Sequence, residues 1–270
     1  MPPAGAAGIS QVTALSARTE TDANACATRS ARVNPEILVE RLFETLISGD
    51  RPAARAIVDE TMRAGMAPEK MVSDVYWPCY ELVSKLYRAD QMSRLSHHMA
   101  TRLLRVLVDQ AAARFRSQPA RGRTIFAVCG PNDADELAGQ IAVDLLEREG
   151  FHMTYAGGGI ASDEILAQVQ ETQPDVLLLF ASAPSDLPEI RAMIDQIHEI
   201  GACRGIQVVV GGGVFNRAEG LAEEIGADLW ATHPSELVKS LVDQPARRAT
   251  SDQRTVGRKR RLPTRSAEAA

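Results

Sequence analysis

The segment Arg123–Gln140 reads RTIFAVCGPNDADELAGQ: a short apolar run, a loop with glycine and proline, and then an amphipathic segment. This alternation occurs five times in all up to Leu241. Because strands joined through helices pair in parallel with right-handed crossovers, it predicts an α/β fold with a flavodoxin-like, doubly wound, five-stranded parallel sheet. The expected strands are 125–129, 152–156, 176–180, 207–210 and 228–231, and the expected helices are 136–149, 162–170, 187–200, 217–225 and 234–241.

Glycine-rich or polar loops follow three of these strands. They are Gly130–Gly139, Ser182–Pro184 and Gly211–Gly213. Ligands of doubly wound sheets bind outside the carboxyl ends of the strands, so these loops predict a site at that edge. A fourth glycine run, Gly157–Gly159, follows a strand expected at the edge of the sheet, and a simple turn is the favoured interpretation.

Residues 34–116 carry a helical period instead. Asn34 before Pro35 is typical of a helix start, Gly49 ends that first amphipathic run, and Gly65 ends the second. Pro78 is expected to kink or break the third helix. Short polar turns between the helices predict an N-terminal four-helix bundle, with helices expected near 35–48, 51–64, 68–86 and 93–115.

Composition changes mark the remaining segments. Residues 1–33 are rich in Ala, Ser, Thr and Gly and are expected to be disordered, 117–123 form a polar linker, and the sheet domain spans 124–242. Residues 243–270 are expected to form a basic disordered tail in a chain of net charge -5. Its run 257–261 is typical of a solvated charged segment, and nucleic acid as a partner is the alternative.

Several classes of protein are excluded by what the sequence lacks. No leader and no apolar run of about 18 residues is present, so no membrane partner and a cytoplasmic location are expected. Its four cysteines form no C-x-x-C pair, which argues against structural zinc and a disulfide framework. No common catalytic motif is found, which favours a protein that is not itself an enzyme and whose chemistry would belong to a cofactor.

A four-helix bundle before this five-strand unit resembles the two-part cobalamin-binding module of methionine synthase, corrinoid methyl-carrier proteins and light-sensing cobalamin-dependent regulators. The resemblance covers about residues 35–242 and is clearest at Val208–Gly213 and Ile225–Asp228, which are similar to the family's Gly-Gly loop and Gly-Ala-Asp strand. It implies cobalamin as the cofactor, with Gly211 and Gly212 beside its nucleotide tail and Ser182 bonded to the base of that tail.

The lower side of the implied site departs from the family. The family has an Asp-x-His-x-x-Gly motif. Aligning its glycine on Gly139 places Glu136 at the His position and Ala134 at the Asp position. The resemblance also implies Gly139 as a cofactor contact. Asp133 or Asp135 could supply the missing carboxylate, but no side chain replaces the imidazole. Ligation of cobalt from below by a histidine is therefore not expected, and Glu136 is the residue expected at the cofactor.

The upper side retains a candidate ligand. In light-sensing relatives a Trp and a Glu-His pair cap the corrinoid, and the run Tyr87–His98 resembles this arrangement. The resemblance implies Tyr87 and His97 as cofactor contacts and His98 as a metal ligand.

Each of these features also has a purely structural interpretation. The histidines could be a packing pair, Glu136 could stabilise a helix start, Ser182 could cap a turn, and Gly211–Gly213 could form only a tight turn. The clustered aromatic residues could form either the bundle core or a lid over a macrocycle; they are Tyr76, Trp77, Tyr80 and Tyr87.

The sequence leaves three functions open. The first is a cobalamin-binding or cobalamin-domain-derived sensor or regulator that acts through a protein partner or a second copy. The alternatives are a corrinoid methyl carrier for a methyltransferase system and a degenerate domain that serves as an interaction scaffold.

Overall fold

The computed structural model describes residues 34–200 and 205–250. The expectations for residues 1–33 and for the basic run 257–261 lie outside the described residues. Residues 244–250 of the expected tail do contact the sheet domain: Ala249 N donates to Asp228 Oδ1 over 2.6 Å, and the Arg247 guanidinium lies 4.8 Å from the centre of the Trp230 ring. No helix of the described part is long and apolar enough to cross a membrane.

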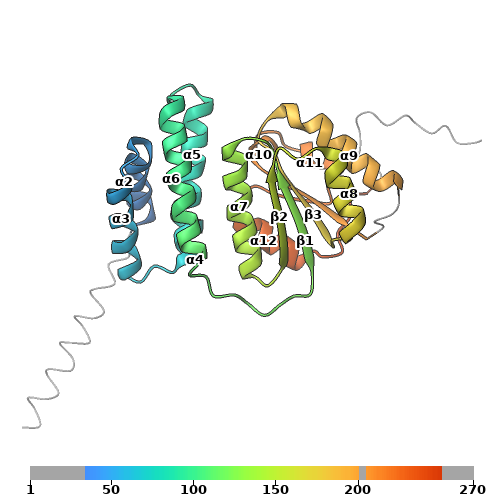
Figure 1. Ribbon diagram of the computed structural model, residues 1–270, viewed down its shortest axis with the longest axis horizontal. Coiled ribbons are helices and arrows are strands. Elements are labelled where there is room, and N and C mark those ends of the chain that lie inside the picture. The colour runs from blue at the N-terminus through green and yellow to red at the C-terminus, as the bar shows by residue number, and fades with distance from the viewer. Residues whose placement is uncertain (1–33, 201–204, 251–270) are drawn as a thin grey trace, which may run out of the picture.

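The N-terminal part is the predicted four-helix bundle (Figure 1). Asn34 caps its first helix by accepting a hydrogen bond from Glu36 N, and Gly49 ends that helix with a left-handed φ of 71°. Its elements are α2 (Pro35–Ser48), α3 (Arg51–Arg63), α4 (Pro68–Met71), the π-helical η1 (Val72–Tyr76), α5 (Trp77–Arg88) and α6 (Arg94–Ala112).

The third bundle helix continues through Pro78 by means of a π-helical turn. In η1 the Trp77 N–H donates to Val72 O, five residues earlier. Proline has no N–H and its ring clashes with the carbonyl four residues back, so a wider turn just before it relieves both problems. The expected break is thus replaced by a local widening.

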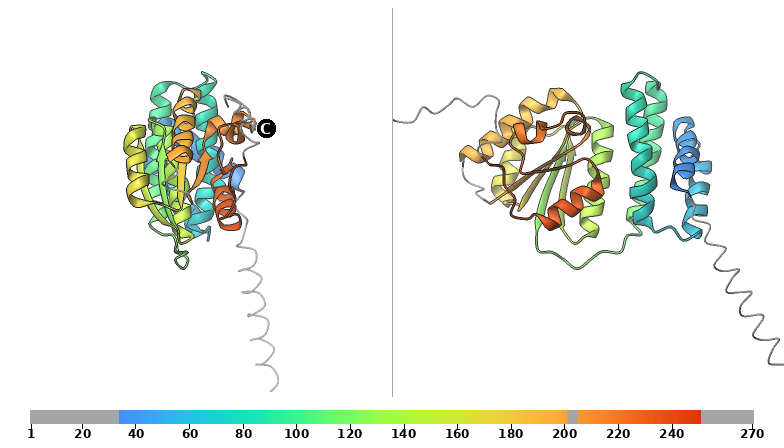
Figure 2. Two further views of the ribbon diagram at one scale, coloured as in Figure 1. Left: turned by 90° about the vertical axis from the view of Figure 1, so that its right-hand side faces the viewer. Right: turned by 180° about the vertical axis from the view of Figure 1, so that it is seen from behind.

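The sheet has the predicted parallel, doubly wound topology, with strand order β2-β1-β3-β4-β5. Helices α7 and α12 cover the face toward the bundle, and α8 and α9 cover the opposite face (Figures 1 and 2). The strands are β1 (Thr124–Cys129), β2 (His152–Gly158), β3 (Val176–Phe180), β4 (Gln207–Gly211) and β5 (Leu229–Ala231). The helices are α7 (Asp133–Arg148), α8 (Ser162–Thr172), η2 (Pro184–Asp186), α9 (Leu187–Ile200), α10 (Gly213–Arg217), α11 (Leu221–Glu224) and α12 (Pro234–Asp243).

Two local predictions were wrong. The expected helix 217–225 is split into α10 and α11, because Gly220 takes a left-handed φ of 79° between them. The run Gly157–Gly159 is not only a turn, since Gly157 and Gly158 pair with Val128 and Cys129 after an irregularity in the β1–β2 register. An extra residue in one strand is a bulge, which glycine accommodates readily.

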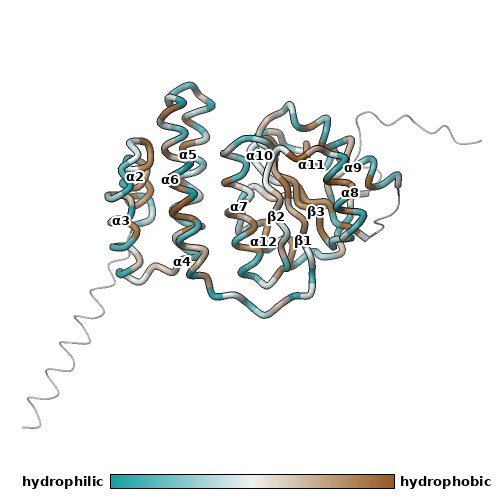
Figure 3. Tube along the Cα trace, in the orientation of Figure 1, coloured by the Kyte–Doolittle hydropathy of each residue, from teal (hydrophilic) through white to brown (hydrophobic). Residues whose placement is uncertain are grey.

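One hydrophobic core joins the two parts of the molecule. Buried residues of α7, including Leu137 and Ile141, pack in the same cluster as Tyr76, Trp77 and Leu104 of the bundle. Figure 3 shows the apolar segments concentrated in the strands and along the inner parts of the helices. Tyr76 is fully buried there, so for this residue the structural interpretation, bundle core, is correct.

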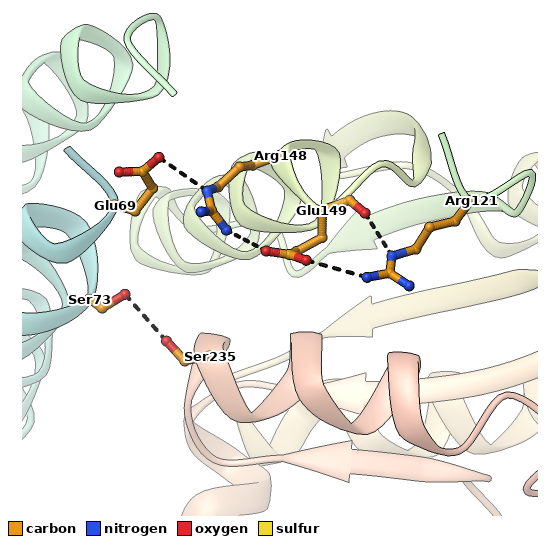
Figure 4. A network of polar contacts seen from close by, with 6 residues as sticks. All are labelled: Glu69, Ser73, Arg121, Arg148, Glu149 and Ser235. Atoms are coloured by element: carbon orange, nitrogen blue, oxygen red, sulfur yellow. Dashed lines mark hydrogen bonds and ion pairs between the residues drawn. The ribbon is translucent and has the colours of Figure 1, made fainter. Parts of the chain in front are cut away.

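Polar contacts tie the bundle to the sheet domain at the end of α7 and at the start of α12 (Figure 4). Arg148 of α7 pairs with Glu69 of α4 over 3.1 Å and with its neighbour Glu149, and Ser235 of α12 donates to Ser73 of η1 over 3.3 Å. Burial raises the pKa of Glu69, but hydrogen bonds to its backbone N–H and to Arg148 outweigh burial and leave the pKa below its ordinary value.

One turn before Arg148, α7 carries a carboxyl group with a buried oxygen that has no hydrogen-bond partner. Asp144 Oδ2 is buried and accepts no hydrogen bond. Burial first, and then the charges of Asp109 on α6 and Glu147, raise the pKa of Asp144 to about 7. The folded protein therefore holds a proton on Asp144 between about pH 4 and 7 that the unfolded chain has already released.

We expect the folded state to lose stability as pH rises through this window, by about 1–2 kcal/mol after allowance for partial solvent access. Asp144→Asn should abolish that loss, so that its urea unfolding midpoint exceeds that of the wild type at pH 8 but not at pH 5. The exposed Asp163→Asn is the matched control. Parallel pH profiles for wild type and Asp144→Asn would contradict the assignment.

Candidate functional site

The candidate site lies where β1, β3 and β4 end. Asn132 caps α7 there, with its Oδ1 accepting from Asp135 N over 3.0 Å, so α7 begins immediately after the β1 loop. The expected helix start at 136 was three residues late because the sequence pattern did not reveal this cap. Glu136 and Gly139 consequently occupy the first two turns of α7.

Helices α6 and α7 run side by side in the same direction. Arg105 contacts Glu136, and four residues further along both helices Asp109 contacts Gln140. From Arg94 to Arg105 helix α6 rises about 16 Å, whereas α7 rises only about 5 Å before Glu136. The tip of the bundle, which is the end of α5 and the start of α6, therefore extends about 12 Å past the start of α7 in the direction of the carboxyl ends of the strands, and α7 lies between the bundle and the sheet (Figure 1).

The tip of the bundle carries Tyr87, His97 and His98, the residues predicted to contact the cofactor from above. The Tyr87 and His97 rings stack with centroids 4.0 Å apart and an interplanar angle of 21°. His97 is 8% exposed and Tyr87 37%. His98 precedes Arg105 by seven residues, two helical turns, so it lies on the face of α6 that meets α7. The structure thus brings Tyr87 and His97 into contact, with the His98 ring centroid 6.0 Å from that of His97.

Glu136, at the family's histidine position, is engaged with the bundle. Its Oε2 accepts from Arg105 Nη2 over 2.9 Å, and both side chains are about one-third exposed. Its backbone O accepts from Tyr155 Oη over 2.9 Å, and Tyr155 Oη lies 3.4 Å from Cys129 Sγ. Burial raises the pKa of Cys129 to about 11, which leaves its thiol protonated at neutral pH.

Asp135 was one candidate to replace the Asp of the family's motif, but its side chain is buried instead of facing the carboxyl edge of the sheet. It is only 1% exposed and hydrogen-bonds Asn132 and Ser182. Burial, opposed by these hydrogen bonds and aided by Asp186, raises the pKa of Asp135. Ser182 therefore has a structural partner in Asp135, while its backbone O accepts from Arg217 over 2.6 Å. The side chains of Asp133 and Ala134 lie outside the described residues.

The predicted glycines are close-packed. A Cβ at Gly139 would lie 2.7 Å from Tyr155 Oη, and one at Gly211 would lie 3.0 Å from the Phe180 ring. At Gly212, which has a φ of +106°, it would lie 2.3 Å from Ala181 O. The space beside them, between Trp77, Phe180 and α12, is a cavity of about 20 Å³, roughly the room that one water molecule needs.

Sequence reasoning missed Arg105 in this region. Arg105 links α6 to the start of α7, and only the pairing of the two helices reveals it. Trp77, one of the clustered aromatic residues named from the sequence, lines the small cavity, and the centroid of its ring lies 5.6 Å from that of His233. Within the described ranges 34–200 and 205–250, no group of three or more His, Cys, Asp or Glu side chains could hold a metal ion.

Gly212→Ala should therefore destabilise the fold itself, by about 2–4 kcal/mol, because it combines a left-handed φ with a backbone collision. Thermal and urea unfolding would measure this. Gly205→Ala, whose Cβ would meet nothing within 4 Å, is the matched control. Equal stabilities for the two variants would mean that Gly212 is not required for packing.

Comparisons with known proteins agree with this architecture. A B12 binding domain family model matches residues 123–239, and a second B12 binding domain model matches residues 38–111. Dimethylamine corrinoid protein 1 of Methanosarcina acetivorans is 27% identical over 106 residues, which are 39% of this chain and 49% of that protein. The chain thus spans about half the length of this relative.

A longer match is to dimethylamine corrinoid protein 2 of Methanosarcina mazei, 22% identical over 205 residues, 75% of this chain and 94% of that protein. Among solved structures, the monomethylamine corrinoid protein of Methanosarcina barkeri has the same fold, with a TM-score of 0.66, 13% identity, and coverage of 77% of this chain and 98% of that one. The chain belongs to the cobalamin-binding domain family, with a helical cap and a Rossmann-like domain, and cobalamin is the cofactor that these matches support.

Proposed function

We propose that this protein is a corrinoid-binding regulator that holds cobalamin between the tip of the bundle and the carboxyl edge of the sheet, and that a protein partner reads its occupancy. The observation that carries the proposal is the extension of α6 past the start of α7, which carries His98 beyond that helix start on the face of α6 that meets α7. Tyr87, His97 and His98 are the proposed upper contacts.

The residues on the bundle side of the proposed site can contact a corrinoid, whereas those on the sheet side offer it no ligand and little space. Above the edge, His98 offers an imidazole, a good ligand for a transition metal. Below it, Glu136 is already paired with Arg105, and the Phe180 ring packs against Gly211. Beside Gly211 and Gly212 only about 20 Å³ is open. We infer that no side chain of this protein replaces the cofactor's lower base, and that its nucleotide tail is not inserted beside these glycines unless Phe180 moves.

The roles of the residues follow from these contacts. Cobalamin, when bound, supplies a cobalt whose upper position can hold an alkyl group or an imidazole. The Tyr87–His97 stack fixes the start of α6 and so orients His98. Arg105 lies on the same face two turns further and joins this face to α7 through Glu136. A movement of His98 along the axis of α6 would therefore reach the contact between bundle and sheet domain.

A corrinoid methyl carrier that works with a methyltransferase is the second candidate. What supports it is the match to proteins named dimethylamine corrinoid proteins, one of them along 94% of its length. An imidazole fixed over the cobalt would hinder methyl transfer, and this geometric argument ranks the carrier second.

The test is reconstitution with hydroxocobalamin, followed by gel filtration and ultraviolet-visible spectroscopy. We expect the corrinoid to be retained with a spectrum shifted from that of the free cofactor. His98→Ala should remove the shift and weaken retention at least about tenfold, because a metal–imidazole bond is lost. Lys85→Ala on the exposed side of α5 is the control for the bundle fold.

The other outcomes separate the candidates. Retention with a spectrum that His98→Ala leaves unchanged, together with methyl transfer from a methylated corrinoid donor, would overturn the regulator in favour of the carrier. A colourless protein after gel filtration would contradict corrinoid binding and leave an interaction scaffold as the function to pursue.

A further inference from the structure

A recess of about 250 Å³ lies between the start of α3 and the flank of α6. Arg51, the first residue of α3, forms one wall. Thr101, Arg102, Arg105 and Val106 of α6 form the other. The two walls are held together by packing of the α2–α3 turn on α6, since a Cβ at Gly49 would lie 3.1 Å from Met99 Sδ. The recess is thus built by tertiary packing of two helices.

The chemistry of this recess is cationic. Three of its five lining residues are arginines and none is acidic, in a chain whose net charge is -5. Thr101 is 3% exposed and its hydroxyl donates to His97 O over 2.9 Å, which fixes this side chain against α6. Guanidinium groups present planar forks of donors that match phosphate and carboxylate oxygens.

Arg105 belongs both to the recess and to the contact between domains. Its Nη2 donates to Glu136 Oε2 on α7 over 2.9 Å. An anion in the recess would approach the same guanidinium that Glu136 holds. The anion and Glu136 would then compete for Arg105, because its guanidinium must turn toward one of them and away from the other.

We infer that the arginine recess is a binding site for a small oxyanion with two or more negative charges, of the phosphate or dicarboxylate class, and that Glu136 is its internal competitor for Arg105. The site requires no corrinoid and goes beyond the proposed function. Occupancy of the recess weakens the Arg105–Glu136 ion pair and so weakens the contact between the bundle and the start of α7.

The test is isothermal titration calorimetry of the full chain, without corrinoid, with inorganic phosphate, pyrophosphate and succinate as separate probes. Saturable binding of at least one probe is expected, and the ranking of the three distinguishes phosphate from carboxylate chemistry. Arg51→Gln and Arg102→Gln should each weaken binding about tenfold, as expected for loss of a charge-assisted hydrogen bond. Arg94→Gln, an exposed arginine on the same helix outside the recess, should leave it unchanged.

Two further variants separate competition from structural damage. Arg105→Gln and Glu136→Gln both remove the same ion pair, so damage to the domain contact would change affinity in the same direction. Competition instead requires opposite signs: Arg105→Gln weakens binding, and Glu136→Gln strengthens it several-fold because it removes the competing carboxylate charge. Absence of saturable binding by all three probes, equal losses in Arg94→Gln and Arg102→Gln, or weakening in Glu136→Gln would each overturn the inference.

Discussion

The contact between α6 and α7 is the interaction on which the rest of the structure depends. Apolar residues of α7 complete the core of the bundle, and the polar pairs Arg105–Glu136 and Asp109–Gln140 fix the helices in register and in the same direction. Burial supplies most of the stabilisation of such a contact, whereas partly exposed ion pairs chiefly set its register. This register carries the tip of the bundle past the start of α7, in the direction of the carboxyl ends of the strands.

The same contact explains why Glu136 differs in role from the histidine it resembles in position. A carboxylate in the first turn of α7 benefits from the helix dipole and from Arg105. An imidazole could not form that ion pair while neutral. The carboxylate of Glu136 thus forms a bond between the two domains that a neutral imidazole at this position would not form. Gly139 and Gly211 are also close-packed against side chains of the protein itself, Tyr155 and Phe180, which occupy the space beside these glycines.

Much of the fold was predictable because its signals are local. Strand β3 and helix α9 begin and end where the hydrophobic period predicts, and Asn34 and Gly49 bound α2 as their capping preferences indicate. The errors arose where backbone geometry decides: Gly220 divides α10 from α11, a π-helical turn carries the chain through Pro78, and the Asn132 cap starts α7 earlier. A residue pattern does not reveal which of several allowed backbone paths packing will select.

For the candidate site, the sequence alone determined which chemical groups are available: Glu136 in place of a histidine, the glycines at the strand ends, and the paired histidines of the bundle. The sequence also determined that a helical bundle precedes the sheet domain, because the hydrophobic residues repeat with a helical period first and with alternating strand and helix patterns afterwards. Only the tertiary structure decided that Arg105 holds Glu136, that Tyr87 stacks on His97, and that Phe180 fills the space beside Gly211. These pairings join residues 10 to 31 positions apart, and they depend on how helices and strands pack against one another, which no local pattern encodes.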